Sequence, residues 1–165
     1  MNRIIGIDFG RKRTGLAVSD PLGVFASPLE TVPGTKVLEF LKEYSISETI
    51  TDFVVGWPRN LDGTLSEAAA DVKAFLGRLE KAFPDVPVHL EDERFTSVLA
   101  HRAMIDGGMK ASDRKDKASV DRISAAIILQ GFLDRTAGTP SGTGFAPETL
   151  SVPPVRTRRN SGKKK

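Results

Sequence analysis

Three acidic residues stand where a carboxylate calls for a chemical explanation. Asp8 ends the apolar segment 3–8, and a bare carboxylate in a buried strand is costly to desolvate unless a cation, donors or a raised pKa compensates. Glu93 follows a second apolar segment, 86–90, and Asp121 lies near the start of the last predicted helix, on the same face as small and apolar residues. Taken singly, each also has a structural explanation, as a turn cap, a charged loop residue and a helix-dipole partner.

Taken together, the three acids predict a site for hard metal ions. Phosphodiester hydrolysis needs an activated water and a stabilised leaving oxygen, which two cations about 3.5–4 Å apart can supply. Mg²⁺ takes oxygen ligands and keeps several waters, so a few carboxylates suffice. We therefore expect Mg²⁺ or Mn²⁺ on Asp8, Glu93 and Asp121. The chain has no cysteine, which excludes thiolate ligands, and we interpret His89 and His101 as structural because they share no ligand spacing.

The elements that must position these acids follow from hydrophobic periodicity. Three strands separated by short turns predict antiparallel hairpins, and Pro28 places the third at an edge or a bulge. Thr64 and Glu67 match a capping box before a helix, Thr96 or Ser97 caps another, and segment 109–117 is expected to be mobile. The predicted strands are 3–8, 15–19, 24–32, 52–56 and 86–90, and helices cover 37–44, 64–83, 96–107 and 119–135. This order predicts an α/β fold with a mixed five-stranded sheet and helices on both faces.

The C-terminal segment differs in composition from the rest. We predict one domain over residues 1–137 and a disordered basic tail over 138–165, rich in Gly, Pro, Ser and Thr. The last ten residues hold six cations and no acid, so residues 1–155 carry a net charge of −3 although the whole chain carries +3. Such a tail suits either a polyanionic partner or solubility alone. No apolar run approaches the roughly 18 residues of a membrane span, and no secretory signal is recognisable. The absence of cysteine fits a reducing cytoplasm.

Four ordered motifs resemble the YqgF/RuvX family. They are residues 6–10 (Gly-Ile-Asp-Phe-Gly) with 15–18 (Gly-Leu-Ala-Val), 56–64 (Gly-Trp-Pro-Arg-Asn-Leu-Asp-Gly-Thr), 92–97 (Asp-Glu-Arg-Phe-Thr-Ser) and 120–126 (Val-Asp-Arg-Ile-Ser-Ala-Ala). The resemblance covers residues 3–135. It implies a ribonuclease H-like fold related to Holliday junction resolvases, and a cytoplasmic bacterial nuclease proposed to process the 5′ end of pre-16S ribosomal RNA.

The resemblance also assigns the metal-binding catalytic positions to Asp8, Glu93 and Asp121. The chain departs from the wider superfamily at the fourth strand, where RuvC resolvases carry an acid and this sequence has Gly56-Trp57-Pro58. The acid must then come from after the fifth strand. Asp92 or Glu91 could share the role of Glu93.

Basic residues cluster around the same end of the predicted sheet. A phosphate backbone passing an acidic centre would need such cations, although about half of them could equally be ordinary solvated side chains. The candidates for nucleic-acid binding are Arg11, Lys12, Arg13, Arg59, Arg94, Arg114 and Lys115.

Other functions remain open at this level. An actin-like ATPase has a similar Asp-Phe-Gly loop but needs two such domains, and this chain has length for one. A Holliday junction resolvase acting on branched DNA, and a non-catalytic nucleic-acid-binding module, both fit the fold. Clustered acids argue against the latter, because a phosphate binder gains nothing from negative charge. The sequence does not choose RNA or DNA, and it leaves a homodimer open.

Overall fold

The computed structural model describes residues 1–60, 64, 66–93 and 96–137, except for the side chain of Ser97. Its sheet has the strand order β3-β2-β1-β4-β5, in which β1, β2 and β3 pair antiparallel, and β1, β4 and β5 pair parallel. The strands are β1 (Asn2–Asp8), β2 (Thr14–Ser19), β3 (Ala26–Val32), β4 (Thr49–Trp57) and β5 (Val88–Asp92). The helices are α1 (Val37–Ser47, after the 3-10 turn Gly34–Lys36), α2 (Ala69–Ala82), α3 (Thr96–Asp106), α4 (Ala111–Arg114) and α5 (Lys117–Ala137).

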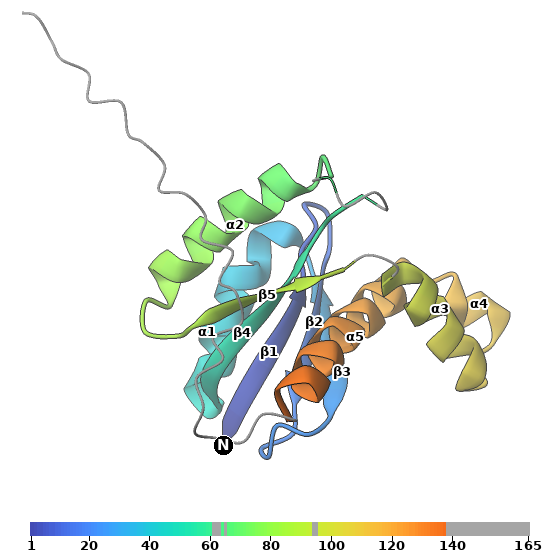
Figure 1. Cartoon of the computed structure of the whole chain (residues 1–165), viewed down its shortest axis with the longest axis horizontal. Coiled ribbons are helices and arrows are strands. Elements are labelled where there is room, and N and C mark those ends of the chain that lie inside the picture. The colour runs from blue at the N-terminus through green and yellow to red at the C-terminus, as the bar shows by residue number, and fades with distance from the viewer. Residues whose placement is uncertain (61–63, 65, 94–95, 138–165) are drawn as a thin grey trace, which may run out of the picture.

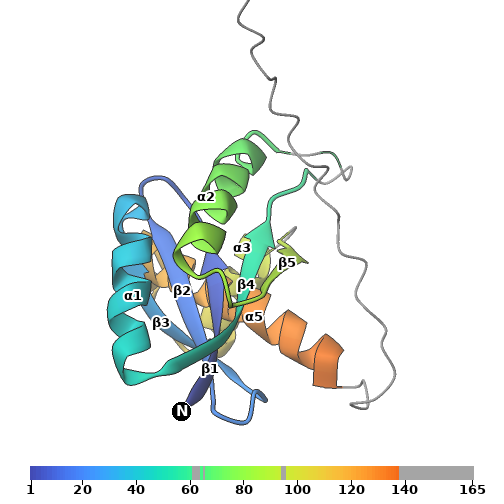
Figure 2. The same ribbon diagram turned by 90° about the vertical axis from the view of Figure 1, so that its left-hand side faces the viewer.

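Helices cover both faces of the sheet, as predicted. Side chains alternate along a strand, so Ile5 and Ile7 of β1 point to one face and pack with α1 and α2, whereas Val54 of β4 points to the other and packs with α5. Figures 1 and 2 show α1 and α2 on one side of the sheet and α5 on the other. Phe9, just beyond β1, stacks on Phe75 of α2 with ring centroids 4.4 Å apart, which fixes the start of the β1–β2 turn.

Two glycines allow α5 to lie directly on the hairpin. A Cβ at Gly6 would be 2.7 Å from Leu129 Cβ and 2.9 Å from the Ala125 carbonyl oxygen. A Cβ at Gly15 would overlap the carbonyl oxygen of Asp121. The N-terminal half of α5 is therefore held at backbone distance from β2, and this contact determines where Asp121 can stand.

Several local predictions need correction. The capping box is wrong: α2 begins at Ala69, and its N-cap Ala68 makes no side-chain cap bond. Strand β5 runs later than expected and includes Glu91 and Asp92, which leaves Glu93 as the first acid beyond it. Segment 109–117 contains a helix, α4, and Figure 1 shows α3 and α4 together beyond the sheet, near the first turn of α5.

The third strand behaves as Pro28 indicated. Strand β3 is an edge strand, and the β2–β3 register shifts where Pro28 faces Ala17. The predicted disordered tail lies outside the described residues. Among the helices that are described, none has the length and apolarity needed to cross a membrane.

Candidate active site

Asp8 and Glu93 meet at the edge where the parallel strands end. Asp8 is the last residue of β1, and Glu93 leaves β5 two strands away. The Glu93 backbone is fixed on both sides, because its N–H donates to the Trp57 carbonyl at 3.3 Å and its carbonyl accepts from the Thr96 N–H at 3.0 Å. The carboxyl ends of parallel strands are the usual place for ligands in such sheets.

The Glu93 side chain crosses β4 in the space that Gly56 leaves free. A Cβ at Gly56 would be 2.5 Å from Glu93 Oε2 and 2.7 Å from Ile128 Cδ1. The carboxyl group thereby comes into hydrogen-bond contact with that of Asp8. The glycine at the end of the fourth strand and the acid after the fifth strand therefore depend on each other, because Gly56 leaves the space that the Glu93 side chain occupies.

The Asp8 and Glu93 carboxyl groups influence each other's pKa. Burial raises the pKa of Asp8 well above its usual range, and the neighbouring charges of Glu93 and then Asp121 raise it further. Burial also raises the pKa of Glu93, its hydrogen bond with Asp8 opposes that rise, and the charge of Asp92 adds to it. Without a cation, the pair therefore retains a proton between its oxygens at pH values where isolated carboxyls are ionised.

Asp121 stands beside this pair in a different electrostatic state. It lies in the second turn of α5, with a side chain about a quarter exposed, and its Oδ2 accepts a 2.8 Å hydrogen bond from Arg13 Nε. No group of three acids or histidines within the described residues is arranged as a metal-ligand cluster. The structure therefore brings Asp8 and Glu93 together and leaves Asp121 close by, paired with an arginine.

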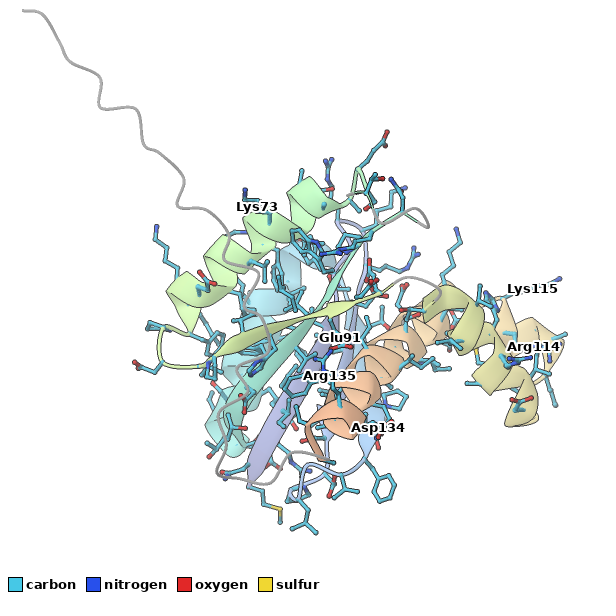
Figure 3. All side chains as sticks on the ribbon, viewed as in Figure 1. Lys73, Glu91, Arg114, Lys115, Asp134 and Arg135 are labelled. Atoms are coloured by element: carbon cyan, nitrogen blue, oxygen red, sulfur yellow. The ribbon has the colours of Figure 1, made fainter. Side chains whose placement is uncertain are left out.

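The donor set fits a hard divalent cation. It consists of carboxylate oxygens on two strand ends and one helix, and the Asp8 and Glu93 carboxyl groups share a hydrogen bond whose proton a cation can replace. Of the alternatives to Glu93, Glu91 is engaged elsewhere: its two oxygens accept bonds of 3.2 and 2.6 Å from Arg135 of α5 (Figure 3). Asp92 is exposed and acts on Glu93 through its charge.

The predicted basic residues are divided between paired and unpaired positions. Arg11 Nε donates to Asp71 Oδ2 of α2 at 2.8 Å, and Arg13 is the partner of Asp121. Lys12 is exposed on the same turn, and Arg59 is partly buried with an Nε that has no hydrogen-bond partner within the described chain. Arg94 lies outside the described residues. Arg114 is partly buried and Lys115 exposed, both at the end of α4 (Figure 3).

Two cavities adjoin the acids and share Arg13 and Asp121 in their walls. One, of about 400 Å³, lies between the β1–β2 turn and the start of α2. The other, of about 420 Å³, lies against α3, α4 and α5, and His101 and Lys117 line it. His101 is exposed and lines this cavity, and the interpretation of it as structural stays a prediction. His89 does have a structural partner, Asp52, at 2.9 Å.

The chain is similar to one described family and to named relatives in other organisms. The family described as "RuvX: Holliday junction resolvase" matches residues 2–135. A protein of Phocaeicola vulgatus with the provisional name pre-16S rRNA nuclease is 48% identical over 134 residues, which cover 81% of this chain and 96% of that protein. A protein of Christiangramia forsetii with the same name is 46% identical over 133 residues, covering 81% and 98%.

A solved structure agrees on the fold. That of Thermus thermophilus RuvC superposes with a TM-score of 0.50 at 21% identity, over 82% of this chain and 96% of the other. At that identity the likeness concerns the fold alone, and it agrees with the predicted ribonuclease H-like architecture.

Proposed function

The chain belongs to the RuvX family of nucleases, and we propose that it hydrolyses phosphodiester bonds with divalent cations held by Asp8, Glu93 and Asp121. The observation that carries this proposal is the Asp8–Glu93 pair, two desolvated carboxyls hydrogen-bonded to each other at the carboxyl end of the sheet. Such an arrangement is costly for a fold to maintain without a use for it, because like charges in a low-dielectric site repel strongly. Mg²⁺ or Mn²⁺ suits the oxygen ligands.

Each residue of the site has a distinct task in this proposal. A bound cation would activate a water and stabilise the leaving oxygen. Asp8 supplies a carboxylate on a rigid strand, and Glu93 reaches it through the gap at Gly56. Asp121 becomes available when Arg13 turns away from it, and the released guanidinium can then donate to a substrate phosphate. Arg59, Lys12 and the cations of α4 would hold the neighbouring backbone, with Arg94 as a further predicted contact.

The proposed substrate is the 5′ end of precursor 16S ribosomal RNA, and the relatives' name supports it. The alternative is branched DNA, which the family description supports. Phosphate contacts position a strand of either kind without specifying it, so the basic residues do not decide between them. Oligomeric state offers a discriminating observation: a four-way junction has two equivalent strands to cut, which calls for a homodimer, whereas a single RNA end needs one active site. Ribosomal precursor processing would place the chain in the cytoplasm.

The test compares two substrates under three metal conditions. The full chain is incubated with a precursor 16S RNA fragment and with a four-way DNA junction, in Mg²⁺, in Mn²⁺ and in chelator. We expect metal-dependent cleavage that Asp8→Asn, Glu93→Gln and Asp121→Asn each nearly abolish. Glu91→Gln is the matched control, because Glu91 lies on the adjoining strand but pairs with Arg135. Full activity in Glu93→Gln would refute its assignment and direct the search to Asp92.

A further inference from the structure

We propose that the cavity against α3, α4 and α5 binds a second backbone phosphate of a single nucleic-acid strand, next to the phosphate that is cut. This inference rests on the proposed nuclease function. It adds that the substrate strand is bound more strongly on the α4 side of the acids than on the α2 side. The occupant is identified by charge complementarity, since the cavity wall is strongly cationic.

The cavity wall combines cations from three separate segments. They are Arg13 from the β1–β2 turn, Arg114 and the C-cap residue Lys115 at the end of α4, and Lys117 from the first turn of α5, with His101 of α3 beside them. Asp121 is the acid that lines the cavity with them, and it already has Arg13 as its partner.

The cations of α4 and α5 are available for a ligand. No ion pair within the described residues involves Arg114, Lys115 or Lys117. An anion here would therefore not have to displace an internal acid. A ring N–H of His101 can donate a further hydrogen bond to a phosphate oxygen.

Side chains, rather than the helix terminus, form this site. The first N–H groups of α5 are occupied by Asp116, whose Oδ1 accepts from the Ala118 N–H at 3.3 Å and whose carbonyl accepts from the Val120 N–H at 3.2 Å. Asp116 also accepts a bond from the Ser119 hydroxyl at 2.8 Å. A phosphate must therefore be held by the flexible cations above the helix, which is the usual chemistry of backbone contacts.

The cavity on the α2 side has fewer unpaired cations in its wall. Its cations lie on one turn, and Asp71 lines the same wall and holds Arg11 at 2.8 Å. With Asp121 paired to Arg13, Lys12 is the cation of that turn without an acid partner among the described residues. A strand passing over Arg13 and Asp121 therefore meets unequal attraction on its two sides, and the stronger side is α4.

The experiment measures binding without cleavage, so that it does not depend on activity. Asp8→Asn in the full chain is titrated with a short fluorescent single-stranded RNA across a range of salt concentrations. Adding Arg114→Ala/Lys115→Ala should weaken binding about tenfold, roughly the value of one charge-assisted hydrogen bond, and should flatten the salt dependence by about 0.7 per phosphate contact. Lys115→Ala/Lys117→Ala should behave alike, which covers a folding defect in the first variant because Arg114 is partly buried.

The matched control removes two lysines far from the cavity. Lys42→Ala/Lys73→Ala changes exposed residues on α1 and α2, and Figure 3 shows Lys73 on α2, remote from α4. An equal loss in the control and cavity variants would overturn the proposal in favour of diffuse attraction, and no loss in the cavity variants would overturn it by showing that these cations do not hold the strand.

Direction is tested separately with chemically neutral phosphates. RNAs carrying one methylphosphonate at successive positions should show a single sensitive position on one side of the cut, and the cavity variants should lose that sensitivity. Sensitivity that is equal on both sides would refute the direction. A wild-type chain that binds in this way but cleaves nothing would refute the nuclease assignment and leave the phosphate site standing.

Discussion

Replacing Asp8 by asparagine should stabilise the protein in the absence of divalent cations. In the wild type, Asp8 and Glu93 are buried in contact and retain a proton between them. An asparagine amide can donate to Glu93 at every pH and carries no charge, so the variant keeps the hydrogen bond and loses the repulsion. This gain in stability should come with loss of the proposed catalytic function, as is common where a site is built for binding.

The size of the effect follows from the raised pKa of Asp8. A folded-state pKa above the unfolded value means that this group's contribution to stability is fully present below the unfolded pKa, about 4, and is lost as pH rises through the folded pKa. Each unit by which folding raises this pKa lowers the free energy of unfolding by about 1.4 kcal/mol at a pH above the folded pKa. For a chain of this size, 1 kcal/mol shifts the melting temperature by about 2–4 °C. The advantage of Asp8→Asn should thus be absent in acid and grow to several degrees at neutral pH.

Thermal melting of wild type and Asp8→Asn, in chelator and in Mg²⁺ and at acidic and neutral pH, measures the stabilisation by the substitution, its pH dependence and the gain from metal. In Mg²⁺ at a hundredfold excess over its dissociation constant, the wild type should gain about 2.7 kcal/mol, and Asp8→Asn much less. Asp121→Asn is the matched control, because it removes both a partly exposed pair with Arg13 worth about 0–1 kcal/mol and the least of the charges that raise the pKa of Asp8, so it should be stabilised much less than Asp8→Asn in chelator. A lower melting temperature of Asp8→Asn than of wild type in chelator at neutral pH would show that the two carboxyls do not form a strained pair.

Three further outcomes are expected. Gly56→Ala should abolish cleavage, because its Cβ would lie 2.5 Å from Glu93 Oε2 and would displace that carboxyl group. The loss of stability should be smaller than that of a core cavity. Retained activity, measured while circular dichroism follows folding, would contradict the proposed path of Glu93. Arg13→Gln should tighten Mn²⁺ binding several-fold without nucleic acid, since Asp121 loses its competing partner; weaker Mn²⁺ binding in a calorimetric titration would refute this. Deleting residues 138–165 should leave melting unchanged and flatten the salt dependence of nucleic-acid binding by about 0.7–0.9 per lost contact; an unchanged slope would reduce the tail to a solubility element.

Hydrophobic periodicity in the sequence was sufficient to predict the strands of the sheet and the position of Asp8 at the end of the first strand. The buried alternation around Ile5 and Ile7 required a strand that ends at Asp8, and the edge position of β3 followed from Pro28. The start of α2 was not readable, because a capping-box pattern at Thr64 and Glu67 carries no information on whether the chain turns there, and the helix begins at Ala69 instead.

Contacts between distant residues were the other part that sequence could not supply. Arg13 and Asp121 are 108 positions apart, and each had a sensible separate role, as a phosphate contact and as a metal ligand. Their pairing depends on α5 lying against Gly15, a backbone approach that no local pattern encodes. The exposure of His101 at the cavity likewise depends on how α3, α4 and α5 assemble.

The negative charge of the three acids at the proposed metal site is compensated in two different ways, and the difference has a consequence for the proposed function. Asp8 and Glu93 are relieved by a proton, whereas Asp121 is relieved by Arg13. A cation must displace the proton to use the first two, so metal affinity should fall as pH decreases. It must also release Arg13 to use the third, and Arg13 borders the cavity proposed for the neighbouring phosphate. A phosphate that attracts Arg13 therefore frees Asp121 for the metal, and by linkage the metal strengthens the hold on the strand to the same degree. Substrate and metal would then complete the site together, which keeps the full acid cluster from assembling around a cation when no strand is bound.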